Sequence, residues 1–412
     1  MITFEQFTLK NGLKVIFHED KTTPMAVVNI IYNVGARDED ESKTGFAHLF
    51  EHLMFGGSKN IENFDAPLQL AGGECNAFTS NDITNYYDIL PAQNLETAFW
   101  LESDRMLELA FTPKSLEVQR QVVIEEFKQR YLNQPYGDVW LQLRPVIYKN
   151  HPYKWATIGK NIEHIEKATM QDVKDFFFTH YGPQNATLVV GGNSTLEEVK
   201  RLSEKWFADI PARAKPQRSL PAEPPQAEAR SLDIERQVPS DAIYLAFRMG
   251  SRLSEEHYAG DLVSDILGRG KSSRLNSELV DKRKLFTSIS AYITASWEDG
   301  LLIVSGNLMD GVSIKEGEAA IWDVIQNMSV EKIQERELTK VKNKFKTAKV
   351  FSEQALMNRV MNIAMFDMMG KLDQINDELS HYDDVSAASI QEFCQNRLMP
   401  TNSSTLRIKA TK

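Results

Sequence analysis

The chain has 412 residues, of which 42% are hydrophobic, and a formal net charge of -10. This composition predicts ordinary globular cores, and the length favours two or three domains, so a disordered chain is excluded. The acidic balance, without any basic block, argues against a nucleic-acid partner and is compatible with peptide ligands.

Targeting and redox signals are weak. No stretch approaches the roughly 18 apolar residues of a membrane span. The N-terminus starts with a strand-like pattern rather than a basic and then apolar signal segment, so we expect a cytoplasmic protein, or a periplasmic one if a signal peptide has been removed. Cys75 and Cys394 are far apart and form no Cys-x-x-Cys pair, so we expect neither a disulfide framework nor a cysteine zinc site.

The first elements are two hairpin-like segments, residues 4–17 and residues 25–32, followed by sequence with helical periodicity. Strands and helices then alternate loosely along the chain. This order predicts the α+β class, with duplicated sandwich domains that each pack helices on one face of a mostly antiparallel sheet.

A helix is predicted within residues 44–57. Apolar residues at positions i, i+3, i+4, i+7 and i+8 from Phe46 form a core-facing stripe. Thr44 is a suitable N-cap, and the pair Gly56-Gly57 can end the helix.

The same helix carries a candidate metal site. His48 and His52 are four residues apart and therefore share one face, which is the spacing that lets two imidazoles bind one zinc ion. Glu51 lies beside them and is placed to take a proton from a zinc-bound water rather than to bind the metal. The alternative is a solvent-exposed helix face that happens to carry two histidines.

A catalytic zinc site needs a third protein ligand. The helical segment 115–131 offers two neighbouring carboxylates, Glu125 and Glu126. Spacing alone does not choose between them, and glutamate pairs on helices are usually only solvated.

A proline-rich segment, residues 211–230, divides the chain because proline cannot continue a helix or a central strand. We expect a zinc-binding domain over residues 1–210, a linker over 211–230, and a homologous non-catalytic domain over 231–412. The halves resemble each other, since Val34-Gly35-Ala36-Arg37 and Met249-Gly250-Ser251-Arg252 each follow an apolar run at an offset of 215 residues.

That offset also shows what the second half lacks. His48, Glu51 and His52 correspond to Val263, Ile266 and Leu267, so the metal chemistry is absent there.

The motif formed by His48, Glu51 and His52 resembles the signature of the pitrilysin-type zinc peptidases, which include insulin-degrading enzyme and mitochondrial processing peptidase. The resemblance covers essentially the whole chain. It implies that His48 and His52 bind Zn²⁺ and that Glu51 is the general base. The family's third ligand is a glutamate about 75 residues further on, and this register selects Glu126 over Glu125.

The resemblance extends to Gly72–Ser80, which is similar to the edge strand along which the family's substrates add as an extra strand. It implies that Asn76, Ala77 and Phe78 contact substrate. One departure lies seven residues before the third ligand, where the family often has a second glutamate and this chain has Gln119.

A second departure bears on partners. Family members that grip substrate through the second half use an arginine and a tyrosine, and the matching positions here are Val280 and Thr287. The resemblance therefore implies a heterodimer with a homologous subunit that carries the arginine–tyrosine pair. A homodimer that uses Arg274 or Arg283 instead is the alternative.

Together these features predict a zinc-dependent endopeptidase subunit acting on short unfolded peptides. Two other functions stay open. The chain could be a non-catalytic scaffold subunit of a larger complex, or a peptidase that processes targeting presequences.

Overall fold

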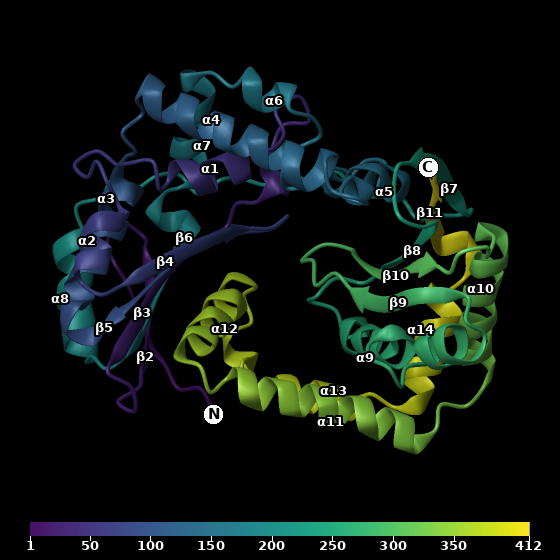
Figure 1. Ribbon diagram of the computed structural model, residues 1–412. Coiled ribbons are helices and arrows are strands. Elements are labelled where there is room, and N and C mark those ends of the chain that lie inside the picture. Colours follow the sequence, from purple (N-terminus) through teal and green to yellow (C-terminus); the bar gives the residue numbers. More distant parts are fainter. Residues whose placement is uncertain (412) are drawn as a thin grey trace. The chain divides into compact units, whose positions relative to one another are not determined.

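The structure is a computed structural model that describes residues 1–411. The chain forms two compact units, each assembled from separate segments (Figure 1). The first comprises residues 1–129, 155–221 and 350–376, and the second comprises the rest of the described chain. The chain passes from the first unit to the second inside the proline-rich segment. Two segments are exceptions: residues 130–154, from the first half of the sequence, belong to the second unit, and residues 350–376, from the second half, belong to the first unit.

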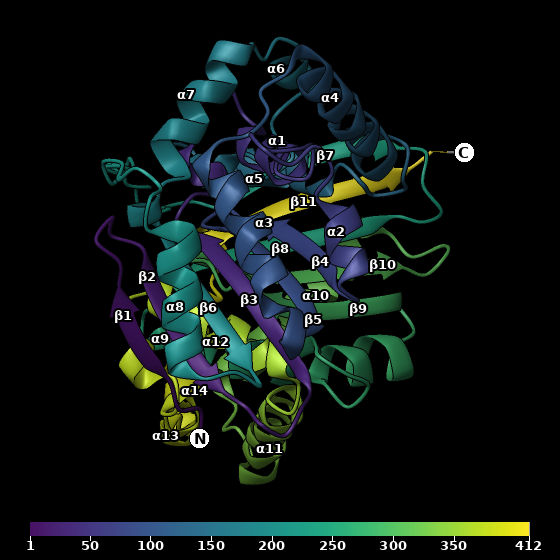
Figure 2. The same ribbon diagram turned by 90° about the vertical axis from the view of Figure 1, so that its left-hand side faces the viewer.

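The first unit contains a six-stranded sheet in the order β1-β2-β6-β3-β5-β4, in which only β2 and β6 pair in parallel. Helices α3 and α8 cover one face of this sheet, and α12 lies on the other (Figures 1 and 2). The strands are β1 (Glu5–Thr8), β2 (Lys14–Glu19), β3 (Met25–Tyr32), β4 (Glu74–Thr79), β5 (Thr84–Pro91) and β6 (Ala186–Gly192). The helices are α1 (Phe46–Leu53), α2 (Asp65–Leu70), α3 (Leu95–Leu107), α4 (Pro113–Phe127), α6 (Glu163–Glu166), α7 (Met170–His180), α8 (Leu196–Phe207) and α12 (Leu356–Met368).

Helix α12 is fastened to this sheet by polar and steric contacts. Asp367 forms an ion pair with Lys14 on β2 and accepts a hydrogen bond from the Thr187 hydroxyl on β6 at 2.8 Å. Gly191 on β6 leaves room for Val360, because a Cβ at that position would collide with the valine side chain. Covered on both faces, β3 is buried over all but its first residue, which explains its continuous apolar sequence.

The second unit contains a five-stranded sheet in the order β7-β11-β8-β10-β9. Its order and strand directions repeat those of β2-β6-β3-β5-β4, including one parallel pair, so the predicted duplication and the α+β class are confirmed. The strands are β7 (Arg230–Arg236), β8 (Ala242–Met249), β9 (Phe286–Ile293), β10 (Gly300–Leu308) and β11 (Ser403–Ala410). The helices are α5 (Val139–Ile147), α9 (Glu256–Gly268), α10 (Ile314–Val330), α11 (Glu335–Ser352, ending in the first unit), α13 (Glu378–Asp384) and α14 (Ala387–Arg397).

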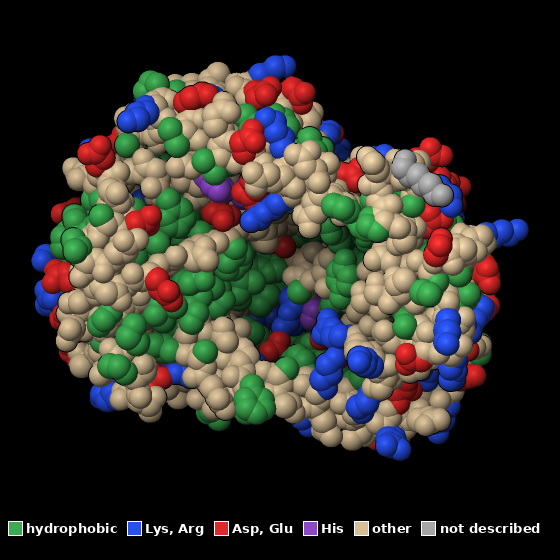
Figure 3. Space-filling view, in the orientation of Figure 1, with side chains coloured by type: hydrophobic (Ala, Val, Ile, Leu, Met, Phe, Trp, Pro, Cys, Tyr) green, Lys and Arg blue, Asp and Glu red, His purple; other side chains and the backbone are tan. Residues whose placement is uncertain are grey.

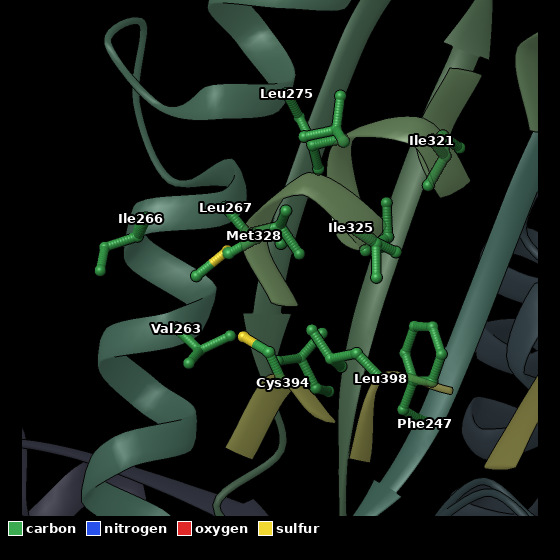
Figure 4. Packing of buried hydrophobic residues seen from close by; sticks show 14 of the residues in the cluster. Phe247, Val263, Ile266, Leu267, Leu275, Ile321, Ile325, Met328, Cys394 and Leu398 are labelled. Carbon is green, nitrogen blue, oxygen red and sulfur yellow. The ribbon is translucent and has the colours of Figure 1, made fainter. Parts of the chain in front are cut away.

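Strand β8 shows how the second sheet is covered. Ile243, Leu245 and Phe247 face the main core formed with α9, α10 and α14 (Figure 4). The alternate residues Ala242 and Ala246 pack in a second cluster against α5. Because side chains alternate along a strand, α5 covers the opposite face. This explains why the segment containing α5 belongs to this unit.

The proline-rich segment forms no helix or strand between residues 211 and 229, and both of its ends are anchored. Arg213 donates hydrogen bonds to the carbonyl oxygens of Tyr181 and Leu107 in the first unit, at 2.9 and 2.8 Å. The Glu223 carboxylate accepts backbone N–H groups of residues 149–151 in the second unit. Across residues 1–411, no helix combines the length and apolarity needed to cross a membrane.

Candidate metal centre

Helix α1 presents two chemically different faces. Phe46, Ala47, Leu49, Phe50 and Leu53 are buried in the first unit, which confirms the predicted apolar stripe. His48 and His52 lie on the other side, with their ring centroids 4.9 Å apart. Figure 3 shows histidine and acidic side chains at the surface where Figure 1 places α1, and the side chains of His48 and His52 are 12% and 23% exposed.

The predicted capping role of Thr44 is wrong. The N-cap residue is Gly45, in a left-handed conformation, and it contributes no side-chain cap. The Thr44 hydroxyl instead hydrogen-bonds His164 Nδ1 at 2.8 Å and accepts the backbone N–H of Lys160 at 2.8 Å. The helix begins one residue too late for Thr44 to reach the first-turn donors, and long-range contacts take its hydroxyl.

Helix α4 brings Glu126, and not Glu125, to the histidines. Glu126 Oε2 lies 3.6 Å from His48 Nε2 and 3.3 Å from His52 Nε2. Glu125 points elsewhere on α4 and pairs with Lys128 at 2.7 Å, with 56% of its side chain exposed. Consecutive residues on a helix diverge by about 100°, so packing of α4 against α1 decides which carboxylate converges.

The three side chains suit a zinc ion. Candidate ligand atoms of His48, His52 and Glu126 all lie within 4.8 Å of one another, and no other such cluster occurs within residues 1–411. Two imidazole nitrogens and one carboxylate oxygen are a typical donor set for catalytic zinc, because three protein ligands leave a fourth position for water or substrate.

Glu51 is held by a strand rather than by its own helix. The Thr79 hydroxyl, at the end of β4, donates a hydrogen bond to Glu51 Oε2 at 2.6 Å. Burial raises the pKa of Glu51, while the Thr79 hydrogen bond and the charge of His52 lower it and the charge of Glu126 raises it. The charges of two candidate ligands, His52 and Glu126, therefore act on the pKa of Glu51, while its carboxylate is hydrogen-bonded to β4.

Strand β4 is an edge strand of the first sheet, and within residues 1–411 it pairs with β5 alone. Within it, Asn76 and Phe78 are exposed and Ala77 is half-buried. The Asn76 side-chain carbonyl accepts the backbone N–H of Ala77 at 2.8 Å. The three residues predicted to bind substrate thus lie on the strand that ends at Thr79.

The sequence analysis missed an ionic group beneath this region. Arg105 on α3 is fully buried, forms an ion pair with buried Glu102, and stacks its guanidinium on the rings of Phe64 and Tyr86 at 4.3 and 4.5 Å. The Tyr86 hydroxyl, on β5, donates to the backbone carbonyl of Phe50 on α1 at 3.3 Å. In the sequence, this ion pair could have been recognised from Glu102 and Arg105, which are three residues apart in a segment with many apolar residues.

The corresponding helix of the second unit has no metal chemistry. Val263, Ile266 and Leu267 on α9 are fully buried in that unit's core, where Val263 lies beside Cys394 (Figure 4). As predicted, apolar packing occupies the positions that correspond to the histidines and the glutamate.

Known proteins resemble this chain over most of its length. Residues 14–159 match the family described as insulinase (peptidase family M16), and residues 167–345 match the peptidase M16 inactive domain. The zinc protease PqqE of Helicobacter pylori is 32% identical over 348 residues, which is 82% of this chain and 77% of the relative. An uncharacterized zinc protease of Bacillus subtilis, YmxG, is 23% identical over 382 residues, which is 91% of this chain and 92% of the relative.

Among solved structures, a protease from Helicobacter pylori superposes with a TM-score of 0.94 at 28% identity. The match covers 99% of this chain and 100% of that one. The whole described fold, including both units, is therefore shared with this protease.

Proposed function

The chain belongs to the insulinase family of peptidases, family M16, and we propose that it is a zinc-dependent endopeptidase subunit that hydrolyses short, unfolded peptides. Convergence of His48, His52 and Glu126 beside Glu51 carries this proposal. A scaffold subunit without catalysis would need neither the donor set nor a half-buried carboxylate next to it, and partial burial of a carboxylate is costly.

The catalytic carboxylate is Glu51. Zinc bound by the three ligands would supply Lewis acidity, which polarises the scissile carbonyl and acidifies a water molecule. Glu51 then accepts a proton from the attacking water and delivers it to the leaving nitrogen as the peptide bond breaks. The hydrogen bond from Thr79 fixes the orientation of the carboxylate.

An extended substrate is proposed to add to the free edge of β4. Main-chain hydrogen bonds would supply affinity there with little dependence on sequence. An incoming backbone carbonyl would replace the Asn76 side chain as the acceptor for the Ala77 N–H. The strand ends at Thr79, which contacts Glu51, so a peptide bound along β4 passes the catalytic carboxylate. Folded proteins lack a free extended segment and would be poor substrates.

The functional enzyme is proposed to contain a second, homologous subunit that supplies an arginine–tyrosine pair. Val280 packs against the core of the second unit, and the Thr287 hydroxyl donates to the Asn307 carbonyl within the sheet. Neither side chain offers a guanidinium fork or a phenol.

The two nearby arginines are already engaged. Arg274 makes two hydrogen bonds to Glu337, at 3.0 and 2.8 Å, and Arg283 pairs with Asp323 at 3.1 Å. These ion pairs favour a heterodimer over a homodimer that uses Arg274 or Arg283 to grip substrate.

Metal analysis combined with peptide hydrolysis tests the proposed activity. We expect one zinc per chain, and cleavage of a flexible fluorogenic peptide that is lost with a chelator and restored by zinc. A stable folded domain should be cut no faster than it unfolds. The opposite result would support a non-catalytic scaffold. In that case the chain would bind no zinc and would show no zinc-dependent hydrolysis, either alone or with a homologous subunit.

A further inference from the structure

The first turn of α1 lacks a capping residue of its own. Gly45 occupies the N-cap position with φ +89°. A side chain there would be strained by this left-handed conformation, and its Cβ would lie 2.7 Å from the Ile158 carbonyl oxygen. Glycine is therefore required at the position where helices usually carry a capping serine, threonine, asparagine or aspartate. The first backbone N–H groups of the helix need an acceptor from elsewhere.

Glu39 supplies that acceptor from a turn outside the helix. Its Oε2 accepts the Gly45 N–H at 2.9 Å, and its Oε1 accepts the Ala47 N–H at 2.9 Å. Both carboxylate oxygens thus bridge the start of α1, and Glu39 is only 7% exposed. Ala47 immediately precedes His48, so the bridge acts on the turn that carries the first histidine.

The turn that carries Glu39 is itself held rigidly. The Trp155 indole N–H donates to the Ala36 carbonyl at 2.8 Å, and Arg37 forms a buried ion pair with Asp82 at 2.8 Å. The backbone N–H of Arg37 donates to the Asn81 carbonyl at 2.9 Å. Contacts from outside the turn therefore hold the backbone segment from which Glu39 reaches the helix.

Keeping this carboxyl group buried is unfavourable in itself. Burial raises the pKa of Glu39 to about 8, and the nearby Asp38 also raises it, whereas hydrogen bonds from the backbone N–H groups of Gly45 and Ala47 lower it. A glutamine would offer one acceptor oxygen instead of two. What Glu39 adds is the second oxygen, so that one side chain accepts two backbone N–H groups at the start of a helix only eight residues long.

We propose that Glu39 is a positioning residue for metal binding, which anchors the first turn of α1 so that His48 and His52 face Glu126. This inference rests on the proposed zinc site. Glu39 does not touch the ligands, so it acts through the backbone of the helix. Groups that orient metal ligands in this indirect way typically change metal affinity roughly 10–100-fold when removed.

The experiment compares zinc affinity, measured by competition with a chromophoric chelator, in the wild type, Glu39→Gln and Glu39→Asp. Glu41→Gln is the matched control, because Glu41 lies in the same loop and pairs with exposed Lys160 instead of α1. We expect Glu39→Gln to weaken zinc binding about 10–100-fold. We expect Glu39→Asp to recover part of the affinity, since it keeps both acceptor oxygens, and Glu41→Gln to match the wild type.

Two further readouts separate positioning from simple stabilisation. The visible absorption spectrum of the cobalt-substituted protein reports ligand geometry, and it should change in Glu39→Gln while thermal unfolding of the metal-free protein changes little. Unaltered zinc affinity and an unaltered cobalt spectrum, even with a lower melting temperature, would overturn the proposal. If Glu39→Gln does not fold, wild-type affinity in a folded Glu39→Asp, whose oxygens are withdrawn by one methylene, would overturn it as well. Absence of zinc binding by the wild type would instead contradict the proposed function.

Discussion

The Thr79 hydroxyl on β4 donates a hydrogen bond to Glu51 Oε2 on α1 at 2.6 Å. This contact joins the edge strand proposed to bind substrate to the carboxylate proposed to move the proton. The two residues are 28 positions apart in sequence, and neither belongs to the three-residue ligand cluster. Orientation of the proposed general base would therefore depend on the strand that is proposed to bind substrate.

Thr79→Val is expected to lower kcat by roughly 10–100-fold, because a hydrogen bond to a charged group contributes about 1.5–3 kcal/mol. Zinc content should not change, since the ligands are untouched. Thr79→Ser keeps the hydroxyl and is the matched control. Steady-state kinetics on a fluorogenic peptide and metal analysis of all three proteins check this. A valine variant with wild-type kcat would show that the hydrogen bond has no catalytic role.

Glu126→Gln is expected to remove most of the bound metal, because it replaces the only carboxylate in the ligand cluster. Glu125→Gln is the matched control on the neighbouring residue, which pairs with Lys128 instead, and it should bind zinc as the wild type does. Metal analysis after identical purification compares the two. Metal loss in the Glu125 variant but not in the Glu126 variant would reassign the third ligand.

Glu51→Gln is expected to abolish hydrolysis and to retain zinc. Loss of general base catalysis typically costs a factor of roughly 10²–10⁴, and His48, His52 and Glu126 remain in place. Activity and zinc content are measured on the same preparation. Substantial turnover in the zinc-loaded variant would exclude Glu51 as the base.

His257 on α9 is expected to make the second unit less stable at acidic pH. Burial, together with the charge of Arg252, lowers its pKa from 6.5 to about 3. Between these values the unfolded imidazole binds a proton that the folded one does not. Stability is therefore lost as the pH falls below about 6.5, by up to about 1.4 kcal/mol per pH unit.

The variant His257→Gln removes this titrating group, so its free energy of unfolding should depend less on pH than that of the wild type. Urea unfolding of both proteins at pH 7 and pH 5 gives the comparison. Equal losses of stability between the two pH values would contradict the assignment to His257.

The lone chain is expected to hydrolyse peptides weakly, and a homologue that carries the arginine–tyrosine pair but no metal motif should raise its activity. Val280 and Thr287 cannot supply these groups, and Arg274 and Arg283 are held in ion pairs. Peptide hydrolysis is measured for each protein alone and for the mixture. Full activity of the lone chain, unchanged by the homologue, would rule out the heterodimer.

Much of the fold and of the site could be predicted from local sequence patterns. The apolar stripe from Phe46 predicts α1, and the four-residue spacing places His48 and His52 on one helix face whatever the rest of the chain does. The repeated motifs at an offset of 215 residues predict the duplication that the two sheet topologies confirm. These features were predictable because each depends on residues close together in the chain or on a repeated pattern.

Long-range packing was not readable in the same way. Segments 130–154 and 350–376 carry ordinary amphipathic helices, and nothing local indicates that each packs on the sheet built by the other half. Likewise, a threonine just before a helical stripe is a good cap by local rules, yet Thr44 is taken by His164 and Lys160. Competition between distant partners overrides local preference in both cases.

The sequence by itself therefore determined the two histidines, the adjacent glutamate and the duplicated α+β architecture, because helical and strand periodicity are properties of short segments. Only the tertiary structure decided which groups meet them. Packing of α4 turns Glu126 toward the histidines, the end of β4 brings Thr79 to Glu51, and a fixed turn delivers Glu39 to the start of α1. The physical reason is that a hydrogen bond or a ligand cluster requires placement within a few tenths of an ångström. Elements far apart in the sequence reach that precision only when the complete core fixes their orientation.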